Sequence, residues 1–393
     1  MTYRRSALAV LFAVVFVDLL GFGMVIPAMP NHAERLGATL GSTGWLLTGY
    51  SAMQLVFTPI WGRLSDRLGR RPLLLGSIAM TSVGFLGYAL APSFGWLLAS
   101  RLFAGVATAN IAIAQAYVAD VTPPEGRARG MGIIGAAFGA GFVLGPTVGG
   151  VLSGIAESLP GFAAAGLAAA NGLAAWFLLP EPRARAAGPG RAGLRALREE
   201  LARPGIRGLI GVFFLAVTAF SVLEATLALL ASHRYGLDDA HVNYLFAFIG
   251  LVVVVVQGGL IGPLTRRFGE KPLLVAGLAL QAAGFALLPW SPGLWGLGAV
   301  CVPLAVGNGL VHPSLSSLLS RQAREWDQGG TLGMGQSAGA LGRIVGPISA
   351  TTAYDHLWYA APYLGAAVLL ALGAGIGTTL RRLAGAPARA DAT

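Results

Sequence analysis

Two acidic side chains, Asp18 and Glu224, lie inside long apolar stretches of the sequence. Asp18 lies about twelve residues into its stretch, a depth of roughly 18 Å if that stretch is an α-helix. A charged carboxylate in hydrocarbon costs about 2.5–3.5 kcal/mol, so acids in membrane helices usually face an internal cavity. A desolvated carboxyl group can bind and release a proton near neutral pH. Both acids are therefore candidate proton carriers, and the alternative is a hydrogen-bonded carboxyl that fixes helix packing.

Three basic side chains, Arg101, Arg343 and His312, also interrupt apolar stretches. An unpaired arginine is expensive in lipid, so each arginine should face the interior and have a partner. For Arg343 we expect a structural pair rather than contact with a ligand. His312 can join proton transfer, although it can equally be held structurally on its helix beside Pro313.

Uncharged amides form the remaining polar set within these stretches. Isolated amides in membrane helices more often join helix to helix than contact a ligand. With Arg343 they are the candidates for lining a substrate cavity: Gln54, Asn110, Gln115, Asn243, Gln257, Asn308 and Gln336. The sequence contains no metal-ligand cluster, phosphate-binding loop or nucleophile triad, so we expect no metal, no cofactor and no enzymatic activity.

The elements that position these residues must be membrane helices. Apolar residues make up 55% of the 393 residues and charged residues 11%, which is too little charge to coat a soluble globule. About 20 apolar residues cross the hydrocarbon core as a helix, and lipid leaves no other economical choice for the backbone. We predict an all-α membrane protein with twelve spans: 6–28, 44–62, 72–91, 96–118, 130–153, 160–179, 207–231, 241–262, 272–290, 294–319, 330–353 and 358–380.

Two polar loops, GRLSDRLGRRP at 62–72 and GPLTRRFGEKP at 262–272, repeat one another. Self-similarity at such an offset indicates a duplicated half. We therefore predict a six-helix bundle in each half, a linker, and a disordered tail. The predicted boundaries are 1–180, 181–206, 207–383 and 384–393. The arginine-rich linker is expected to be solvated, with a short amphipathic helix against anionic lipid.

The distribution of arginine predicts the orientation of the chain in the membrane. Almost all of the basic residues fall on the side of both termini, the two repeated loops and the linker. Basic loops stay in the cytoplasm, so we predict a multi-pass protein of the cell's inner (plasma) membrane with both termini cytoplasmic. The net charge of +10 does not indicate nucleic-acid binding, because the arginines lie in short turns between apolar spans. We expect a monomer in the lipid bilayer whose partners are a small molecule and a proton.

A glycine pattern marks the fifth span, GAGFVLGPTVGG at 139–150. Gly141, Gly145 and Gly149 recur every four residues, which makes a flat face for close helix contact. Pro146 removes a backbone hydrogen bond and bends the helix. We expect this face to form a packed interface between the two halves, where rocking would occur.

Four stretches in this order resemble the major facilitator superfamily, within it the drug/proton antiporters, and most of all the tetracycline-resistance-type efflux transporters. They are DLLGFGMVIPAMP at 18–30, GRLSDRLGRRP at 62–72, AYVADVTPPEGRARGMG at 116–132 and GAGFVLGPTVGG at 139–150. The resemblance covers essentially the whole chain. It implies two pseudo-symmetric six-helix bundles and proton-coupled export of small amphipathic molecules or drugs by alternating access.

The resemblance also implies roles for single residues. An acid is common at the place of Asp18, and Arg101 matches an arginine implicated in proton transfer. Asp66 would meet the positive N-terminal end of the eleventh helix, near Gly330. Arg70 would pair with an acid that ends the fourth helix. Together these residues would latch the cytoplasmic face: Gly62, Asp66, Arg67, Gly69, Arg70 and Asp120. Gly141, Gly145, Pro146 and Gly149 match the antiporter motif.

The chain also departs from the tetracycline antiporters. They carry an acid in the third helix, a histidine in the eighth and an acid in the ninth, where this chain has Gly84, Gln257 and Gly284. In the second loop, Arg266 and Glu270 replace the residues equivalent to Asp66 and Arg70, so the latch should be asymmetric. The transported compound stays open. The alternatives are a proton symporter or uniporter that imports a metabolite, or a non-transporting membrane sensor on this fold.

Overall fold

The protein is described by a computed structural model of residues 2–38, 40–108, 110–123, 126–182, 194–236, 239–324 and 327–380. Every regular element in these ranges is a helix, which confirms the all-α prediction. Nine helical stretches in this part of the chain are long and apolar enough to cross a membrane. The predicted tail, 384–393, lies outside the described residues.

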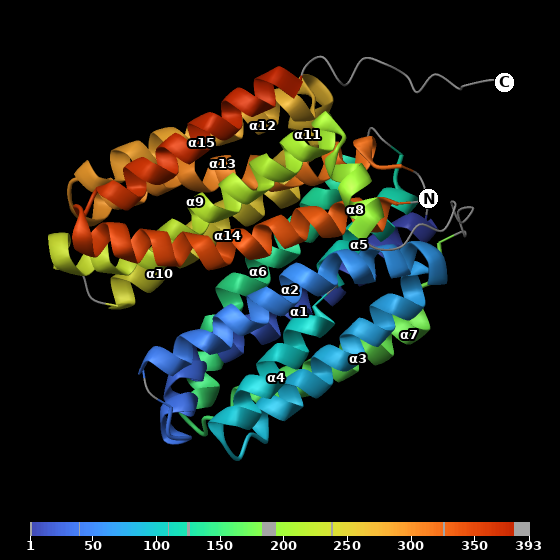
Figure 1. The fold of residues 1–393 in the computed structure, drawn as a ribbon, viewed down its shortest axis with the longest axis horizontal. Coiled ribbons are helices and arrows are strands. Elements are labelled where there is room, and N and C mark those ends of the chain that lie inside the picture. The colour runs from blue at the N-terminus through green and yellow to red at the C-terminus, as the bar shows by residue number, and fades with distance from the viewer. Residues whose placement is uncertain are drawn as a thin grey trace.

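The first half of the chain forms one group of helices, coloured blue to green in Figure 1. Its members are α1 (Thr2–Arg35), α2 (Leu40–Leu68), α3 (Arg70–Ala89), α4 (Phe94–Ala107), α5 (Asn110–Val121), α6 (Arg127–Ser153) and α7 (Leu159–Leu178). Within this group α1 packs against α6 and α7, and α3 packs against α4 and α7. The fourth predicted span, 96–118, is two helices, because the backbone of Thr108 leaves the helical region (ψ 73°) and ends α4.

The second half forms a matching group, coloured yellow to red in Figure 1. Its members are α9 (Pro204–Tyr235), α10 (Asp239–Val255), α11 (Ile261–Phe268), α12 (Glu270–Leu287), α13 (Gly293–Gln322), α14 (Gln328–His356) and α15 (Ala361–Thr379). A π-helical turn, Val256–Leu260, joins α10 to α11, so the eighth predicted span is one helix with a local bulge. Such bulges occur mostly at functional sites.

The two bundles meet along α2 and α14, with further contacts from α6 to α10 and from α5 to α13 and α14. Glycine allows the closest approach. A Cβ atom added to Gly62 would lie 2.2 Å from the carbonyl oxygen of Gly329. One added to Gly333 would lie 2.9 Å from the backbone of Pro59. Gly62, which was predicted to begin the polar loop 62–72, lies within α2, because that helix continues to Leu68. The absence of a side chain there is required for the contact between halves near the latch.

The glycine stripe of α6 corrects one prediction. Cβ atoms at Gly141, Gly145 and Gly149 would all collide with α1, as near as 2.3 Å to the carbonyl oxygen of Met24. The stripe therefore packs inside the first bundle, not between the halves. The face of α6 that meets the other half carries different glycines: Gly132, Gly135 and Gly139. A helix turns 100° per residue, so Gly139 and Gly141 point to nearly opposite sides.

The linker helix α8 (Leu194–Leu201) is present as predicted. Its Glu200 is not solvated, however, because it is only 2% exposed. Arg203 Nη1 lies 2.8 Å and Arg324 Nε 3.2 Å from its carboxylate oxygens. These two ion pairs offset the cost of removing the carboxylate from water. The linker is thereby attached to the loop that precedes α14.

Candidate functional site

One hydrogen bond joins the two bundles deep in the helices. Arg343 Nη2, on α14, donates to Gln54 Oε1, on α2, at 2.6 Å. Arg343 is the charged group that acts on Glu224, which α9 contributes from the same half. The predicted structural pairing of Arg343 therefore exists, but its partner is a neutral amide of the other half. The charge of Arg343 attracts the carboxyl group of Glu224. Within the described residues, however, the two side chains do not form an ion pair.

The first acid, Asp18 on α1, accepts a hydrogen bond from Asn110 Nδ2 at 3.0 Å. Near it lies Tyr50 of α2, whose ring stacks on Phe22 with centroids 5.2 Å apart. Thr108 Oγ1 donates to the Tyr50 hydroxyl at 2.8 Å, beside the break between α4 and α5. Sequence reasoning missed Tyr50, because one tyrosine in an apolar span gives no signal of its own.

Tyr50 lies between the region of Asp18 and that of Arg343, because its hydroxyl interacts electrostatically with both charged groups. These side chains are neither fully buried nor fully exposed: Asp18, Tyr50, Glu224, His312 and Arg343. Apolar neighbours on the same helices are sealed, for example Leu11 and Leu223 at 0% exposure. We call these five residues, with Gln54 and Asn110, the central cluster. It brings proton-binding groups of both halves together with one fixed positive charge.

His312 on α13 packs edge-on against Phe213 of α9, with centroids 5.6 Å apart. Arg343 is the charged group that acts on it. Phe213 is only 2% exposed, so this aromatic contact fixes the histidine of the central cluster against the core of the second bundle.

The other predicted lining amides divide by location. Gln336 Nε2 donates to Gln115 Oε1 at 3.3 Å, and Gln115 Nε2 donates to Ser316 Oγ at 3.3 Å. These two consecutive hydrogen bonds join the halves on the latch side. Gln281 Nε2 donates to Asn308 Oδ1 at 3.5 Å inside the second bundle. Asn308 thus acts as a link between α12 and α13. The side chain of Asn243 lies outside the described residues.

Gln257 lies in the π-helical turn and is 3% exposed. It packs against Gly135 of α6 so closely that a Cβ atom there would lie 2.0 Å from Gln257 Oε1. That oxygen is buried without a hydrogen-bond partner. Gln257 is therefore part of the contact between halves.

Arg101 is 1% exposed and lies apart from the central cluster. Its guanidinium carbon sits 5.0 Å from the ring centroid of Tyr88 and 5.7 Å from that of Phe85. Its hydrogen bond to the carbonyl of Gly84 is long, at 3.4 Å. Tyr50 is one of the groups that act on it electrostatically. The expected partner of this arginine is thus an aromatic pair rather than a carboxylate.

The latch contacts expected at the repeated loop are confirmed. Asp66 accepts hydrogen bonds from the backbone N–H groups of Gly329, at 3.0 Å, and Gly330, at 3.1 Å, in the first turn of α14. Arg70 lies 2.5 Å from Asp66 and 2.9 Å from Asp120. The carboxylate therefore meets the positive end of the helix dipole across the two halves. Gly69 turns the chain between α2 and α3 at a φ of 102°, whereas Arg67 is exposed.

Two further acids near these contacts were not predicted. Asp327 Oδ1 lies 3.4 Å from Arg63 Nε, next to the N-terminus of α14. Burial raises the pKa of Asp327 to about 6, against the attraction of Arg63. Glu181, which sequence reasoning placed in the linker, accepts hydrogen bonds from the backbone of Arg70, at 2.7 Å, and Arg71, at 2.9 Å. It caps α3 within the first bundle.

The second loop carries the charge-reversed version of one latch contact. Glu270 Oε1 lies 2.8 Å from Arg321 Nη2, where the first half has Arg70 and Asp120. Arg321 is 37% exposed, whereas Arg70 is 6% exposed. The predicted asymmetry is therefore present in both the sign of the charges and their burial.

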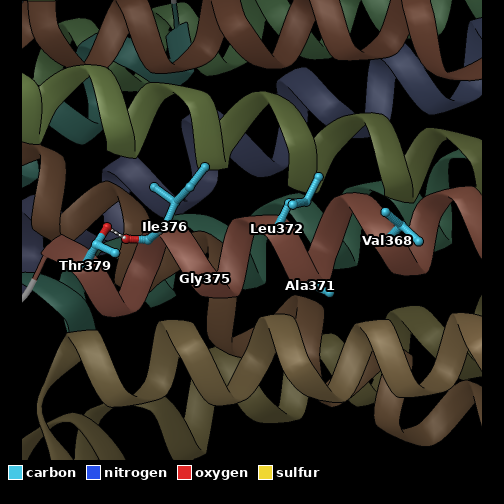
Figure 2. Close-up of a pocket in the computed structure, with 6 residues that line it drawn as sticks. All are labelled: Val368, Ala371, Leu372, Gly375, Ile376 and Thr379. Carbon is cyan, nitrogen blue, oxygen red and sulfur yellow. Dashed lines mark hydrogen bonds between the residues drawn. The ribbon is translucent and has the colours of Figure 1, made fainter.

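A shallow apolar groove on α15 lies away from all of these residues (Figure 2). Val368, Leu372 and Ile376 line it, and the Thr379 hydroxyl is occupied by the carbonyl of Ile376 at 2.8 Å. Such a surface suits lipid chains and offers no polar recognition. In the part of the chain that the structure describes, no His, Cys, Asp and Glu cluster could hold a metal ion.

Comparisons with known proteins agree with this geometry. The family model of the Major Facilitator Superfamily matches residues 11–325 and 258–392. The tetracycline resistance protein of class C from Escherichia coli is 34% identical over 362 residues, 89% of this chain and 90% of its own length. Major facilitator superfamily domain-containing protein 10 from Bos taurus is 30% identical over 403 residues, 89% of this chain and 88% of its own.

The crystal structure of the human organic anion transporter MFSD10 is similar at a TM-score of 0.87 and 27% identity. The likeness covers 95% of this chain and 99% of that chain. Fold, spans and relatives point the same way: this multi-pass membrane protein belongs to the Major Facilitator Superfamily.

Proposed function

We propose that the protein is a proton-driven antiporter that exports a small amphipathic molecule. The observation that carries the proposal is the central cluster. It sets an accessible acid from each half, Asp18 and Glu224, around the Arg343–Gln54 contact. Acids at this depth are retained at a cost, and a proton carrier requires them. We place the protein in the inner membrane with both termini cytoplasmic.

Alternating access supplies the mechanism. The bundles, residues 1–180 and 207–383, would rock about the central cluster. Latch contacts, the Gln115–Gln336 hydrogen bond and the glycine contacts of α6 all join the halves on the latch side. We assign this arrangement to the outward-facing state, in which the carriers exchange protons with the outside.

Coupling would arise from competition for charge. A proton taken up by Asp18 or Glu224 removes a negative charge from the cluster, and Arg343 then stays positive beside Gln54. A substrate that enters from the cytoplasm would replace the proton as the partner of these groups. Because only one of the two can be held at a time, inward proton flow would drive export.

Relatives guide the choice of compound. The similarity to tetracycline resistance proteins favours a tetracycline-like drug as the substrate of this protein. This chain, however, has Gly84, Gln257 and Gly284 where those proteins carry an acid, a histidine and an acid. A second candidate is an organic anion, which the human structural neighbour transports by its title. Arg343 can bind such an anion, because its hydrogen-bonded partner is neutral. An anion would bind best while Glu224 is protonated, which would couple anion and proton in the same direction, as in the symport alternative.

A proton-flux measurement tests the proposal. The protein is reconstituted in liposomes with a pH-sensitive dye inside and an imposed pH gradient. Tetracycline, a cationic dye and an aromatic carboxylate are then added in turn. We expect one compound to release protons from the acidic side, and Asp18→Asn to abolish that release while the protein stays folded. Glu199→Gln, on the linker helix, serves as the control. Wild-type flux in Asp18→Asn would refute the proton role of Asp18.

A further inference from the structure

A row of polar side chains runs through the first bundle from the end of α1 at Arg35, which is remote from the latch. It begins at the surface with Glu157, in the connection between α6 and α7. Arg35 Nε lies 2.8 Å from the carboxylate of Glu157. His32 Nδ1 lies 3.9 Å from the other oxygen. His32 is 9% exposed, so the row passes at once from the surface into the bundle.

Aromatic contacts continue the row inward. The rings of His32 and of Tyr88 on α3 lie against each other at a tilt of 39°, with centroids 5.1 Å apart. The guanidinium of Arg101, on α4, lies 5.0 Å from the same Tyr88 ring. Tyr88 is 0% exposed. One turn beyond Arg101, α4 packs against α2 so closely that a Cβ atom on Gly105 would lie 2.4 Å from the carbonyl oxygen of Tyr50. The centroid of the Tyr50 ring lies 5.2 Å from that of Phe22, one turn from Asp18 on α1. The row thus leads from the surface to the turn of α1 that carries the first acid.

Three atoms in the middle of this row lack a hydrogen-bond partner: His32 Nε2, the Tyr88 hydroxyl and Arg101 Nε. Buried polar groups in proteins are almost always hydrogen-bonded to protein or to ordered water. A packing cluster would be served better by phenylalanine than by a tyrosine whose hydroxyl bonds nothing. Three consecutive groups of this kind, on three helices, mark places where buried water would bridge one side chain to the next.

We propose that this row is a proton path that connects the outer surface to Asp18 through the interior of the first bundle. The inference rests on the proposed role of Asp18 as a proton carrier. One proton enters at Glu157 and His32, and one arrives on the Asp18 carboxylate. Between them, His32, the bridging waters, Tyr88 and Tyr50 each accept one proton and donate another. Arg101 keeps its protons and orients the water beside it. No relay group gains or loses a net proton, but His32 ends in its other tautomer and the hydroxyls and waters end reversed, so each must reorient before the next transfer.

The chemistry of the entrance suits this task. Burial lowers the pKa of His32, against the attraction of Glu157 and a hydrogen bond with the backbone of Tyr88, and the positive charge of Arg35 lowers it further. His32 is therefore neutral at physiological pH, and a neutral imidazole carries one donor and one acceptor nitrogen, as a relay requires. The part of the path from Glu157 to Arg101 lies outside the central cluster, and the path enters the cluster only at Tyr50 and Asp18. A proton can therefore reach the cluster from the side of the first bundle, without passing between the halves.

The path is tested by the rate at which Asp18 takes up a proton. Purified protein in lipid nanodiscs is subjected to a rapid pH drop, and the carboxyl C=O stretch is followed by time-resolved infrared spectroscopy. The band that Asp18→Asn removes reports Asp18, so no substrate is needed. Tyr88→Phe keeps the ring and removes only the hydroxyl, and His32→Gln removes the imidazole. His356→Gln is the matched control, because His356 is an exposed histidine at the far end of α14.

We expect Tyr88→Phe and His32→Gln to slow the appearance of the band by about 100-fold, the size of a typical positioned proton-transfer effect. The final amplitude should not change, because a path alters the rate and not the equilibrium. Wild-type rates in both variants, or equal slowing in His356→Gln, would overturn the path. A wild-type protein without the Asp18 band would instead refute Asp18 as the proton carrier, which is the failure of the proposed function.

Discussion

The contact between Asp66 and the N-terminus of α14 should control how often the cytoplasmic face opens. Asp66→Asn preserves the size of the side chain but removes its charge. The two backbone N–H bonds across the halves, at 3.0 and 3.1 Å, lose their charge assistance. The 2.5 Å ion pair with Arg70 is also lost, but it lies within the first bundle and is lost from the closed and the open state alike. Both partners are nearly buried, with side chains 4% and 6% exposed, so solvent screening does not weaken the estimate.

Hydrogen bonds to charged groups contribute about 1.5–3 kcal/mol each. Arg70 keeps Asp120 as a partner at 2.9 Å, so the full penalty of an unpaired buried charge does not arise. We therefore expect a loss of about 2–3 kcal/mol from the closed state. Because each 1.4 kcal/mol is a factor of ten, this raises the open population by roughly 30- to 150-fold.

Thiol labelling measures that population directly. Cys301 is the only cysteine and is buried, so Cys301→Ser gives a silent background. Ser316→Cys then places a thiol between the halves on the latch side, at a position 2% exposed in the closed state. The labelling rate with a soluble maleimide is proportional to the fraction of time the latch is open. Asp66→Asn should raise the rate by the factor above.

Glu181→Gln is the matched control. Glu181 also caps a helix with two backbone hydrogen bonds, at 2.7 and 2.9 Å, but all of its contacts lie within the first bundle. It should leave the labelling rate within about threefold of the wild type, which is less than 1 kcal/mol. Equal rates in Asp66→Asn and the wild type, or equal acceleration by Glu181→Gln, would refute the idea that the cross-half cap holds the latch.

Three further outcomes are expected. Burial raises the pKa of Asp327 to about 6 from 3.8, so the closed latch binds a proton that an open, solvated carboxyl does not. Closure should therefore strengthen about tenfold as the pH falls from 7 to 5 and weaken as it rises through 6; Asp327→Asn should abolish this dependence of the labelling rate. Gly149→Ala should destabilise the protein by about 1–3 kcal/mol, because the new Cβ would lie 2.3 Å from a backbone oxygen of α1. Gly150→Ala meets nothing within 4 Å and should not lower the melting temperature in detergent. Glu270→Gln breaks an ion pair whose arginine, Arg321, is 37% exposed. It should therefore change the labelling rate by less than about fivefold, or 1 kcal/mol, which is far below the effect of Asp66→Asn. An effect as large as that of Asp66→Asn would contradict the asymmetry of the two loops.

The sequence alone determined the membrane architecture. Apolar length specifies spans because lipid offers no partner to a free backbone group. Repeated residues such as Gly62 and Gly262 indicate a duplicated half. The acids Asp18 and Glu224 could also be found, because a carboxyl in an apolar run is conspicuous by its cost. The motif residues Asp66 and Arg70 even predicted their contacts, through the resemblance that they carry.

The tertiary structure decided which of these residues meet. The Arg343–Gln54 hydrogen bond joins positions 289 residues apart, and nothing in the local pattern of either helix specifies the other. The glycine stripe at Gly141 was correctly identified as a packing face but assigned to the wrong neighbour. Spacing gives the face of a helix and not the helix that covers it. Tyr50 and Tyr88 gave no signal, because an aromatic residue in a span is ordinary until its hydroxyl is seen beside an acid or an arginine. Local periodicity therefore determined the helices of this protein, whereas long-range packing decided the polar contacts that no motif carries, such as Arg343–Gln54.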